Sequence, residues 1–438
     1  MLIAAQVPSN FPVGVVVALM LYGLGRVIIR RVAFAEANPW LIRILTASLI
    51  LHLLAAPAQI FVVDHFYHGI ADWIRYTHQG ALLAPDFRHF NFTLAGANVR
   101  QIVNDGSVSI ATGIVMTLVG SNELATFLVF SWLSFVGAIL FYRAFTLTFS
   151  GADHRRYALM LFFLPSLIFW TADVSKESIM MLALGLSAYG AAKILSRRRG
   201  GFVLVVPGVV IGVLVRPNEM LLMLAGFAVA MMVPTASRRQ NLGGLRRLAG
   251  LVFLAGLLAL SAGLTLRYLH GGSGGSLSLQ QTNANNQGSG LGFGSSGVPY
   301  SSNILTFPRD VYEVLFNPLP YNSHGTGELV AAFENTVMLG LIVLSLRNLR
   351  IVPRAAFARP YLMLCTVYTA GFIYAFAALG NLGLIERERT MMFPFMLVLL
   401  AIPRAPRDAP PMYEWELRRR TRLVLRHAWE RAAAPTRG

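Results

Sequence analysis

Charged side chains interrupt a chain that is otherwise strongly apolar. The stretch WTADVSKES, residues 170–178, lies between the apolar runs LMLFFLPSLIF and IMMLALGLSAYGAA. Guanidinium and ammonium groups bind phosphate oxygens, and arginines stabilise the negative charge that develops on a departing diphosphate. The interrupting charges predicted to bind such a substrate are Lys176, Glu177, Arg216, Arg387 and Arg389.

The carboxylate of Asp64 follows an apolar run and precedes the aromatic-rich stretch HFYHGIADWIRY. A carboxylate in this position can accept the proton of an acceptor hydroxyl or orient that hydroxyl. A diphosphate leaving group needs no general acid, so one base and several cations suffice for a transfer reaction. We therefore predict that Asp64 is the catalytic residue and that it shares one outer cavity with Lys176 and Arg216.

The histidines next to Asp64 raise the question of a metal site. His65 and His68 have a spacing that can place them on one helical face with Asp64 as metal ligands. Surface helices rich in histidine and aromatic residues are commoner than such sites. The prediction is therefore that the site has no metal and no cofactor, with a divalent metal as the alternative.

The same charges also have ordinary structural explanations. Asp173 or Ser175 can cap the helix that follows them. Glu177 can complement the dipole of that helix, and Lys176 can extend to the lipid headgroups. The alternating charges of IERER can pair within their own loop. Arg216 is harder to explain in this way, because an arginine at this helix end runs against the expected charge bias and needs an anionic partner.

The segment FPRDVYEVLFNPLPYNSHGTGELV combines prolines, aromatic residues and a histidine before an apolar run. This composition predicts a re-entrant or surface segment that lines a cavity, although a rigid interfacial turn would have the same composition. Tyr312, Phe316 and Tyr321 can stack on sugar faces, or they can form an aromatic belt at the membrane interface. Tyr321 and His324 complete the predicted substrate-binding residues.

The elements that position these residues follow from composition. The chain has 438 residues, of which 55% are hydrophobic and only 13% are charged, and its mean hydropathy is +0.58. About eleven apolar runs are long enough to cross a hydrocarbon core at roughly 20 residues per helix. The predicted fold is all-α, a polytopic transmembrane helical bundle with outer amphipathic or re-entrant segments.

Basic residues indicate the orientation of this bundle. They fall into groups between alternate apolar runs, which predicts that those loops are cytoplasmic. The groups consist of Arg30, Arg31, Arg43, Arg155, Arg156, Arg197, Arg198, Arg199, Arg238, Arg239, Arg246, Arg247, Arg347, Arg350, Arg354 and Arg359. The start of the chain has no basic n-region, so we predict a retained first span with its N-terminus outside.

The domain organisation follows from the same reasoning. We predict a transmembrane domain over residues 1–403 with large outer loops at 64–110 and 268–326. The Gly/Ser-rich stretch at 271–297 cannot bury a core, and the charge bias places it outside. Residues 404–438 are predicted to form a basic cytoplasmic tail whose arginines lie against anionic lipid.

Several function classes are excluded by the sequence. The net charge of +17 would suggest nucleic-acid binding in a soluble protein, but here the basic residues follow the orientation rule for membrane proteins. The single cysteine, Cys365, excludes an intramolecular disulfide and gives no support to a thiolate zinc site. There is no Walker or dinucleotide-binding glycine motif.

In its apolar architecture, its outward arginines and its flexible outer loop, the chain resembles bacterial multi-spanning glycosyltransferases that use polyprenyl-linked sugars outside the cytoplasm. This group includes the GT-C enzymes and the Wzy-like polysaccharide polymerases. Asp64 resembles the acidic residue of the first outer loop in GT-C enzymes, although its neighbour is His65 and not a second acidic residue. An RX10G pattern found in several polymerases is absent after Arg75, Arg216 and Arg309.

This resemblance implies transfer from a polyprenyl-(di)phosphate-linked saccharide to a saccharide acceptor at the outer face of a bacterial inner membrane, in exopolysaccharide or O-antigen-type assembly. The implied partners are these two saccharides, membrane lipid and other polysaccharide-assembly proteins, without nucleic acid. A transporter or flippase for the lipid-linked saccharide is the alternative. Polarity gathered on one face, and not at the bilayer midplane, favours the enzyme. A third alternative is a structural scaffold protein, but this function would not explain the charged residues on the outer side.

Overall fold

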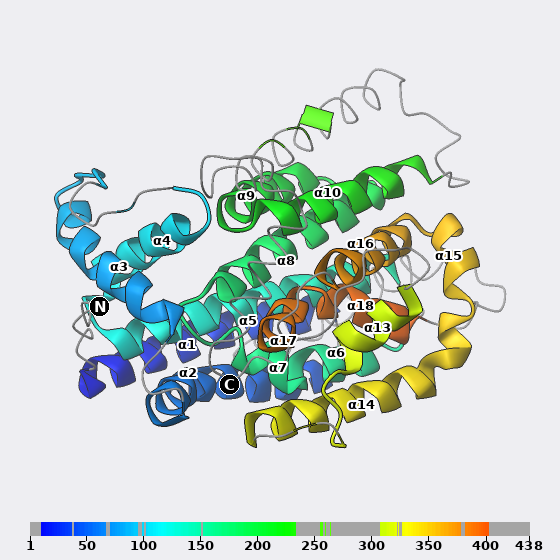
Figure 1. The fold of residues 1–438 in the computed structure, drawn as a ribbon. Helices are drawn as coiled ribbons and strands as arrows, with labels where there is room; N and C mark the ends of the chain where they lie inside the picture. Colours follow the sequence, from blue (N-terminus) through cyan, green and yellow to red (C-terminus); the bar gives the residue numbers. More distant parts are fainter. Residues whose placement is uncertain are drawn as a thin grey trace, which may run out of the picture.

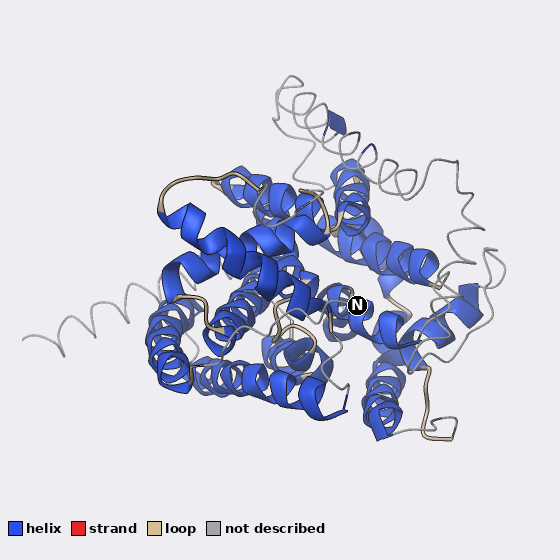
Figure 2. Ribbon diagram, turned by 60° about the vertical axis from the view of Figure 1, so that its left-hand side comes forward, coloured by secondary structure: helices blue, strands red, loops and turns tan. Residues whose placement is uncertain are grey.

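The structure is a computed structural model in which the described residues form helices and no strand (Figures 1 and 2). This agrees with the all-α prediction. The described part of the chain comprises residues 10–36, 39–66, 71–94, 102–149, 152–233, 307–321, 326–377 and 382–402, together with a few single positions. The predicted outer stretch at 271–297 and the predicted tail at 404–438 lie outside it.

Five helices in the described residues are long and apolar enough to cross a membrane. They are α1 (Phe11–Glu36), α2 (Pro39–Phe66), α5 (Glu123–Thr148), α8 (Lys176–Leu195) and α14 (Thr326–Leu349). Four shorter apolar helices accompany them: α4 (Asp105–Val119), α9 (Gly201–Val215), α10 (Pro217–Met232) and α16 (Pro360–Phe376). The structure therefore supports an apolar helical bundle, while the predicted count of about eleven spans is not confirmed.

Other apolar runs are divided into short helices. One run forms α6 (His154–Phe163) and α7 (Pro165–Phe169), which separate where a proline begins the second helix. The last run is preceded by α17 (Leu382–Glu388) and the short 3-10 helix η4 (Arg389–Met391), and it forms α18 (Phe393–Ala401). Between α14 and α16 lies α15 (Val352–Ala358).

Helices α1, α5 and α8 run in the same direction. Near their starts, the side-chain amide of Asn122 donates to the backbone carbonyl of Asn10 at 2.9 Å. Near their ends, Arg143 forms an ion pair with Glu36 at 3.3 Å and donates a hydrogen bond to the Tyr189 hydroxyl, also at 3.3 Å. Matching ends therefore lie together, and the bundle has two distinct ends.

One end of the bundle collects basic loops, and we call it the arginine end. Arg156, at the start of α6, donates a hydrogen bond to Ser345 near the end of α14 at 2.6 Å. Asn348 of α14 donates to the backbone carbonyl of Leu400 near the end of α18. The arginine end includes Arg155, Arg156, Arg197, Arg198, Arg199, Arg347 and Arg350. The predicted grouping thus corresponds to one end of the bundle, and the membrane side that it faces stays a prediction.

Glycines allow the central helices to approach closely. A methyl group added to Gly137 of α5 would clash with the carbonyl oxygen of Met181 in α8. An added methyl group at Gly208 of α9 would lie 2.7 Å from the carbonyl oxygen of Ala183, also in α8. Small residues permit this backbone contact, which membrane helices use in place of a hydrophobic driving force. The position of α8 is therefore fixed from both sides.

Local sequence determines where the site helices begin. Ser175 caps α8 by accepting a hydrogen bond from the backbone N–H of Ser178. Pro217 begins α10, and a proline disfavours helical backbone at the residue before it. Arg216 accordingly has an extended φ of −145° and separates α9 from α10. The junction puts Arg216 at the end of the bundle opposite the arginine end.

Helices α3 (Asp72–Arg88) and α4 form a hairpin beside this second end, at the left of Figure 1. An added methyl group at Gly80 would clash with Thr112, so the two helices pack tightly on each other. They share small apolar clusters of their own, one of which joins Ala84 of α3 to Met116 of α4. Trp73 connects the hairpin to the bundle by an edge-on contact with Phe127, whose ring centroid lies 5.1 Å away.

The predicted surface segment contains α13 (Phe307–Phe316), an amphipathic helix. It buries Asp310, Val314, Leu315 and Phe316 and leaves Arg309 exposed. The helix has the amphipathic character that was predicted for this segment, while its outer location stays a prediction. Tyr321 follows it at 76% exposure, whereas His324 lies outside the described residues.

Candidate functional site

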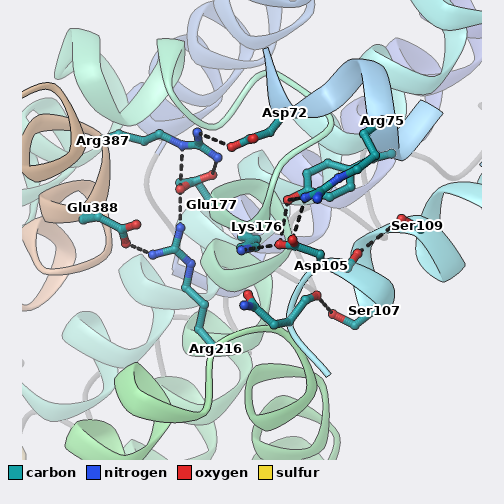
Figure 3. A network of polar contacts seen from close by, with 12 residues as sticks. Asp72, Arg75, Asp105, Ser107, Ser109, Lys176, Glu177, Arg216, Arg387 and Glu388 are labelled. Atoms are coloured by element: carbon teal, nitrogen blue, oxygen red, sulfur yellow. Dashed lines mark hydrogen bonds and ion pairs between the residues drawn. The ribbon is translucent and has the colours of Figure 1, made fainter. Parts of the chain in front are cut away.

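Ten charged side chains meet at the end of the bundle opposite the arginine end. We call the nine of them that form ion pairs the polar network, and Figure 3 shows most of them as sticks. The ion pairs form two sets, which Lys176 and Glu177 bring together as neighbours at the start of α8. The polar network consists of Asp72, Arg75, Asp105, Lys176, Glu177, Arg216, Glu219, Arg387 and Glu388. The tenth, Asp173, lies beside it. These residues come from α3, α4, the loop before α8, α8 itself, the α9–α10 junction, α10 and α17.

Glu177 is the centre of the buried half of the network, and its side chain is 0% exposed. Its Oε1 accepts hydrogen bonds from Arg216 Nη2 at 2.5 Å and from Arg387 Nε at 2.7 Å. Its Oε2 accepts a second bond from Arg387 Nη2 at 2.9 Å. Arg387 therefore grips this carboxylate with two donors, in the bidentate geometry that only a planar guanidinium provides.

Arg216 contacts three carboxylates. Besides Glu177, it pairs with Glu219 at 2.8 Å and with Glu388. Both of these acidic side chains are buried. Removing one partner from a buried ion pair typically costs about 3–5 kcal/mol, because the other charge stays buried without compensation. Arg216 is thus held inside the network, with its own side chain 10% exposed.

The rim of the network is more open. Asp105 accepts hydrogen bonds from Lys176 at 2.6 Å, from Arg75 at 2.5 Å and from the Tyr76 hydroxyl at 3.0 Å. Arg387 reaches outward from Glu177 to pair with Asp72 at 3.3 Å. The rim carboxylates Asp72 and Asp105 are 59% and 41% exposed. Ion pairs of this exposure contribute only about 0–1 kcal/mol.

The surroundings keep the Arg387 guanidinium charged. Burial alone would lower the pKa of Arg387, but Glu177, Asp173 and Asp72 outweigh it and hold that pKa well above its usual range. Burial and the neighbouring Asp105 raise the pKa of Tyr76, so its hydroxyl stays protonated and donates. Arg387 consequently presents fixed positive charge at the rim.

Asp173 lies beside the network and is the least compensated of its carboxylates. Its side chain is buried, and its Oδ1 has no hydrogen-bond partner among the described residues. Burial raises the pKa of Asp173 to about 7. The neighbouring Glu177 carboxylate adds to this rise, and the Arg387 guanidinium opposes it. A carboxyl group with such a pKa can gain or lose a proton near neutral pH.

Arg389 belongs to a separate buried group. It is 2% exposed and donates a hydrogen bond to Asn335 Oδ1 at 2.6 Å. It also donates to the backbone carbonyls of Val314 and Leu315 in α13. Burial lowers the pKa of Arg389 from its ordinary value. The contacts of Arg389 join α13, η4 and α14 to one another.

Glu334 fixes α14 against the short helix α7. Its two carboxylate oxygens accept hydrogen bonds from the backbone N–H and the hydroxyl of Ser166, at 2.9 and 2.5 Å. These bonds hold the start of α7 while the chain turns toward Asp173 and α8. This contact and those of Arg389 therefore support the elements that carry the network.

The predicted site residues divide into three groups in the structure. Lys176, Glu177, Arg216 and Arg387 come together in the polar network. Arg389 lies in the adjacent buried group. Asp64, which was predicted to join them, is exposed on the last turn of α2, and among the described residues no ion pair or hydrogen bond connects it to the network.

The remaining predicted residues lie elsewhere. The hydroxyl of Tyr321 is 2.5 Å from that of Tyr312, and this bond raises the pKa of Tyr312 to about 12. His65 stacks on Phe61, and His68 lies outside the described residues. Within the described residues no group of three or more His, Cys, Asp or Glu side chains could hold a metal ion.

Sequence reasoning missed several members of the site. These are Asp72, Arg75, Asp105, Asp173, Glu219 and Glu388. One signal was available for part of this set. Asp72 and Arg75 are three residues apart in the helical stretch after Asp64, which places them on one face. Asp105 and Glu219 lie in the first turns of α4 and α10, where an acidic residue is expected for reasons unrelated to function.

The arrangement combines two chemical capacities at one place. Arg387 and Lys176 can bind a phosphate group, and the partly exposed Asp72 and Asp105 can accept a proton or orient a hydroxyl. Both pairs lie at the end of an apolar bundle, beside helices that expose hydrophobic side chains. Comparisons of the chain with protein-family models, with curated proteins and with solved structures gave no match.

Proposed function

We propose that this chain is an integral membrane glycosyltransferase. It acts on a polyprenyl-(di)phosphate-linked saccharide at the outer face of a bacterial inner membrane, in assembly of an exopolysaccharide or O-antigen-type polymer. The observation that carries the proposal is the mixed rim, in which Arg387 and Lys176 stand beside Asp72 and Asp105 at one end of an apolar bundle.

In this proposal Arg387 and Lys176 bind the diphosphate of the donor. Asp72 takes the role predicted for Asp64, because Asp72 contacts Arg387 whereas Asp64 has no contact with the network among the described residues. The acceptor oxygen forms a bond to the anomeric carbon as the bond from that carbon to the phosphate oxygen breaks. The hydroxyl proton passes to the Asp72 carboxylate, and the diphosphate leaves with the bonding electron pair, stabilised by the two cations.

The buried half of the network has a supporting role. Glu177 holds Arg216 and Arg387 in fixed positions, and Glu219 and Glu388 hold Arg216 from its other side. Groups arranged in advance need no reorganisation during the reaction, which is where electrostatic catalysis gains its advantage. Arg216 is therefore proposed as a positioning residue, since its carboxylates surround it.

The proposed membrane orientation places the polar network outside and the arginine end in the cytoplasm, with about eleven spans, an outer N-terminus and a cytoplasmic tail. Reporter fusions at Arg198, Ser289 and Arg437 test this. We expect cytoplasmic reporter activity at Arg198 and Arg437 and periplasmic activity at Ser289. The reverse pattern would place the network on the wrong side for an extracytoplasmic transferase.

A deletion strain tests the function whichever sugar the donor carries. Loss of a transferase should leave the lipid-linked saccharide in the outer leaflet, where an impermeant oxidant such as periodate modifies it. A transporter of the same molecule would need similar cations, but its loss should leave the saccharide in the inner leaflet, protected from the oxidant. Unchanged surface polysaccharide and no accumulated lipid-linked saccharide would contradict both functions.

Complementation then connects the phenotype to the site. The unaltered gene should restore the polysaccharide, and Asp72→Asn should not, although the variant protein is inserted at a normal level. Asp64→Asn is the matched comparison, because it removes a carboxylate at the same end of the bundle. Restoration by Asp72→Asn together with failure by Asp64→Asn would return the catalytic role to Asp64.

A further inference from the structure

The opposite charges of the rim come from different parts of the fold. The cations Lys176 and Arg387 belong to α8 and α17, which are parts of the bundle. The carboxylates that occupy them, Asp105 and Asp72, begin α4 and α3, the two helices of the hairpin. Each hairpin helix thus contributes one carboxylate to a bundle cation, as Figure 3 shows.

The hairpin packs partly on itself and partly on the bundle, because Trp73, Tyr76 and Val108 lie in the main hydrophobic core. Its helices bury small apolar clusters between themselves, and Gly80 and Gly113 allow their backbones to touch. The base of the hairpin makes further contacts with the bundle. There the backbone N–H of Asn104 donates to the carbonyl of Leu214 at 2.7 Å, and Trp73 contacts Phe127.

The two kinds of partner differ in how firmly they hold Arg387. Glu177 is fully buried and grips the guanidinium with both oxygens. Asp72 is 59% exposed and makes one contact at 3.3 Å, so water already competes for it. The partner of Lys176, Asp105, is also partly open to water at 41% exposure. An incoming anion would displace the hairpin carboxylates and leave the buried pair intact.

We propose that Lys176 and Arg387 form a diphosphate-binding site and that Asp105 and Asp72 of the hairpin occupy it until the diphosphate arrives. The donor exchanges two internal carboxylates for its own oxygens, so the bundle cations remain paired throughout. The exchange releases Asp72 from Arg387 at the moment when the acceptor hydroxyl requires a base. This inference rests on the proposed function for the identity of the donor.

Binding of inorganic pyrophosphate to the purified full-length protein tests the site without any sugar. Isothermal titration calorimetry in detergent, at fixed low salt, should detect binding by the unaltered protein. Asp72→Asn and Asp105→Asn should each tighten it by up to about fivefold, because each removes a competing carboxylate. Arg387→Gln and Lys176→Gln should each weaken it by at least about tenfold.

Asp64→Asn serves as the charge control in the binding assay. It removes a negative charge from the same end of the bundle without touching either cation, so it should leave the pyrophosphate affinity within about twofold of the unaltered protein. Tightening by Asp64→Asn equal to that by Asp72→Asn would show a general charge effect and overturn the proposal. Weakened or unchanged binding in both hairpin variants would also overturn it, since the carboxylates would then be structural partners only.

The source of the diphosphate is resolved by two further ligands. A prenyl diphosphate should compete with pyrophosphate and respond to the four network substitutions in the same order. Phosphatidylglycerol in nanodiscs should not compete, because its single phosphodiester carries less negative charge and fewer free oxygens than a diphosphate. Competition by phosphatidylglycerol alone would identify a lipid-headgroup site and overturn the proposal. Binding that follows the expected order in a protein whose deletion has no polysaccharide phenotype would retain the site and reject the proposed function.

Discussion

The buried half and the exposed rim of the polar network use the same residue types for different purposes. Glu177 and Arg216 are surrounded by opposite charges and have almost no exposure. Asp72 and Asp105 make similar ion pairs where water reaches them. Because desolvation decides what an ion pair contributes, the buried half determines whether the helix ends stay together, and the rim remains free for chemistry.

The largest expected effect belongs to the buried half. Glu177→Ala leaves Arg216 and Arg387 without their shared partner, so we expect a loss of about 3–5 kcal/mol in stability. Thermal unfolding in detergent and the amount of inserted protein measure it. Glu177→Gln, which keeps the volume and some hydrogen bonding, should fall between Glu177→Ala and the unaltered protein. A Glu177→Ala protein as stable as the unaltered one would show that the buried half does not support the fold.

Substitutions in the rim should lower transfer activity and leave the stability of the protein nearly unchanged. Asp72→Asn is expected to lower transfer by about 10²–10⁴-fold, the usual contribution of a general base, while it changes stability by at most about 1 kcal/mol. Transfer from a polyprenyl-linked donor and thermal unfolding should be measured on the same preparation. A parallel loss of both quantities would remove the distinction between rim and buried half.

Asp173 sharpens the comparison because it is buried like Glu177 but lacks its two arginines. Its pKa is raised from 3.8 to about 7, so the folded state binds its proton more tightly than the unfolded state does. This contribution to stability is complete below about pH 4 and is lost as the pH rises to about 7. Asp173→Asn should remove that dependence and gain stability relative to the unaltered protein above about pH 7.

Thermal unfolding between about pH 4 and pH 8 measures the difference. The comparison variant is Asp64→Asn, whose carboxylate is exposed and should leave the pH profile unchanged in shape. Identical profiles for Asp173→Asn and the unaltered protein would mean that Asp173 is compensated by groups other than Arg387.

Substitution of Arg75 should have the smallest effect on stability. Arg75 is 51% exposed and shares Asp105 with Lys176, so its ion pair is largely redundant. Arg75→Gln should change stability by less than about 1 kcal/mol and the effect should disappear at high salt. Unfolding midpoints at low and high salt provide the measurement, and a salt-independent loss would place Arg75 with the buried half.

The sequence by itself determined the class of the molecule and the position of several charges. The apolar runs with few charges require helices, since only a helix satisfies its backbone in a hydrocarbon environment. The proline after Arg216 separates α9 from α10 at that arginine. The capping serine before Lys176 begins α8. The sequence could assign four charges to one substrate-binding site because each lies near a helix end on the same predicted side of the membrane. These residues are Lys176, Glu177, Arg216 and Arg387.

Only the tertiary structure decided which charges meet. Asp64 and Asp72 follow the same apolar run, eight residues apart, and both lie on the predicted outer side. Sequence patterns locate a helix end to within about one turn, which is roughly 5.4 Å of axial length, whereas an ion pair requires contact within about 3 Å. The partners were selected by the glycine contacts that seat α8 and by the hairpin that carries Asp72 to Arg387. Those contacts join residues far apart in the chain, and their geometry depends on the packed shapes of both helices.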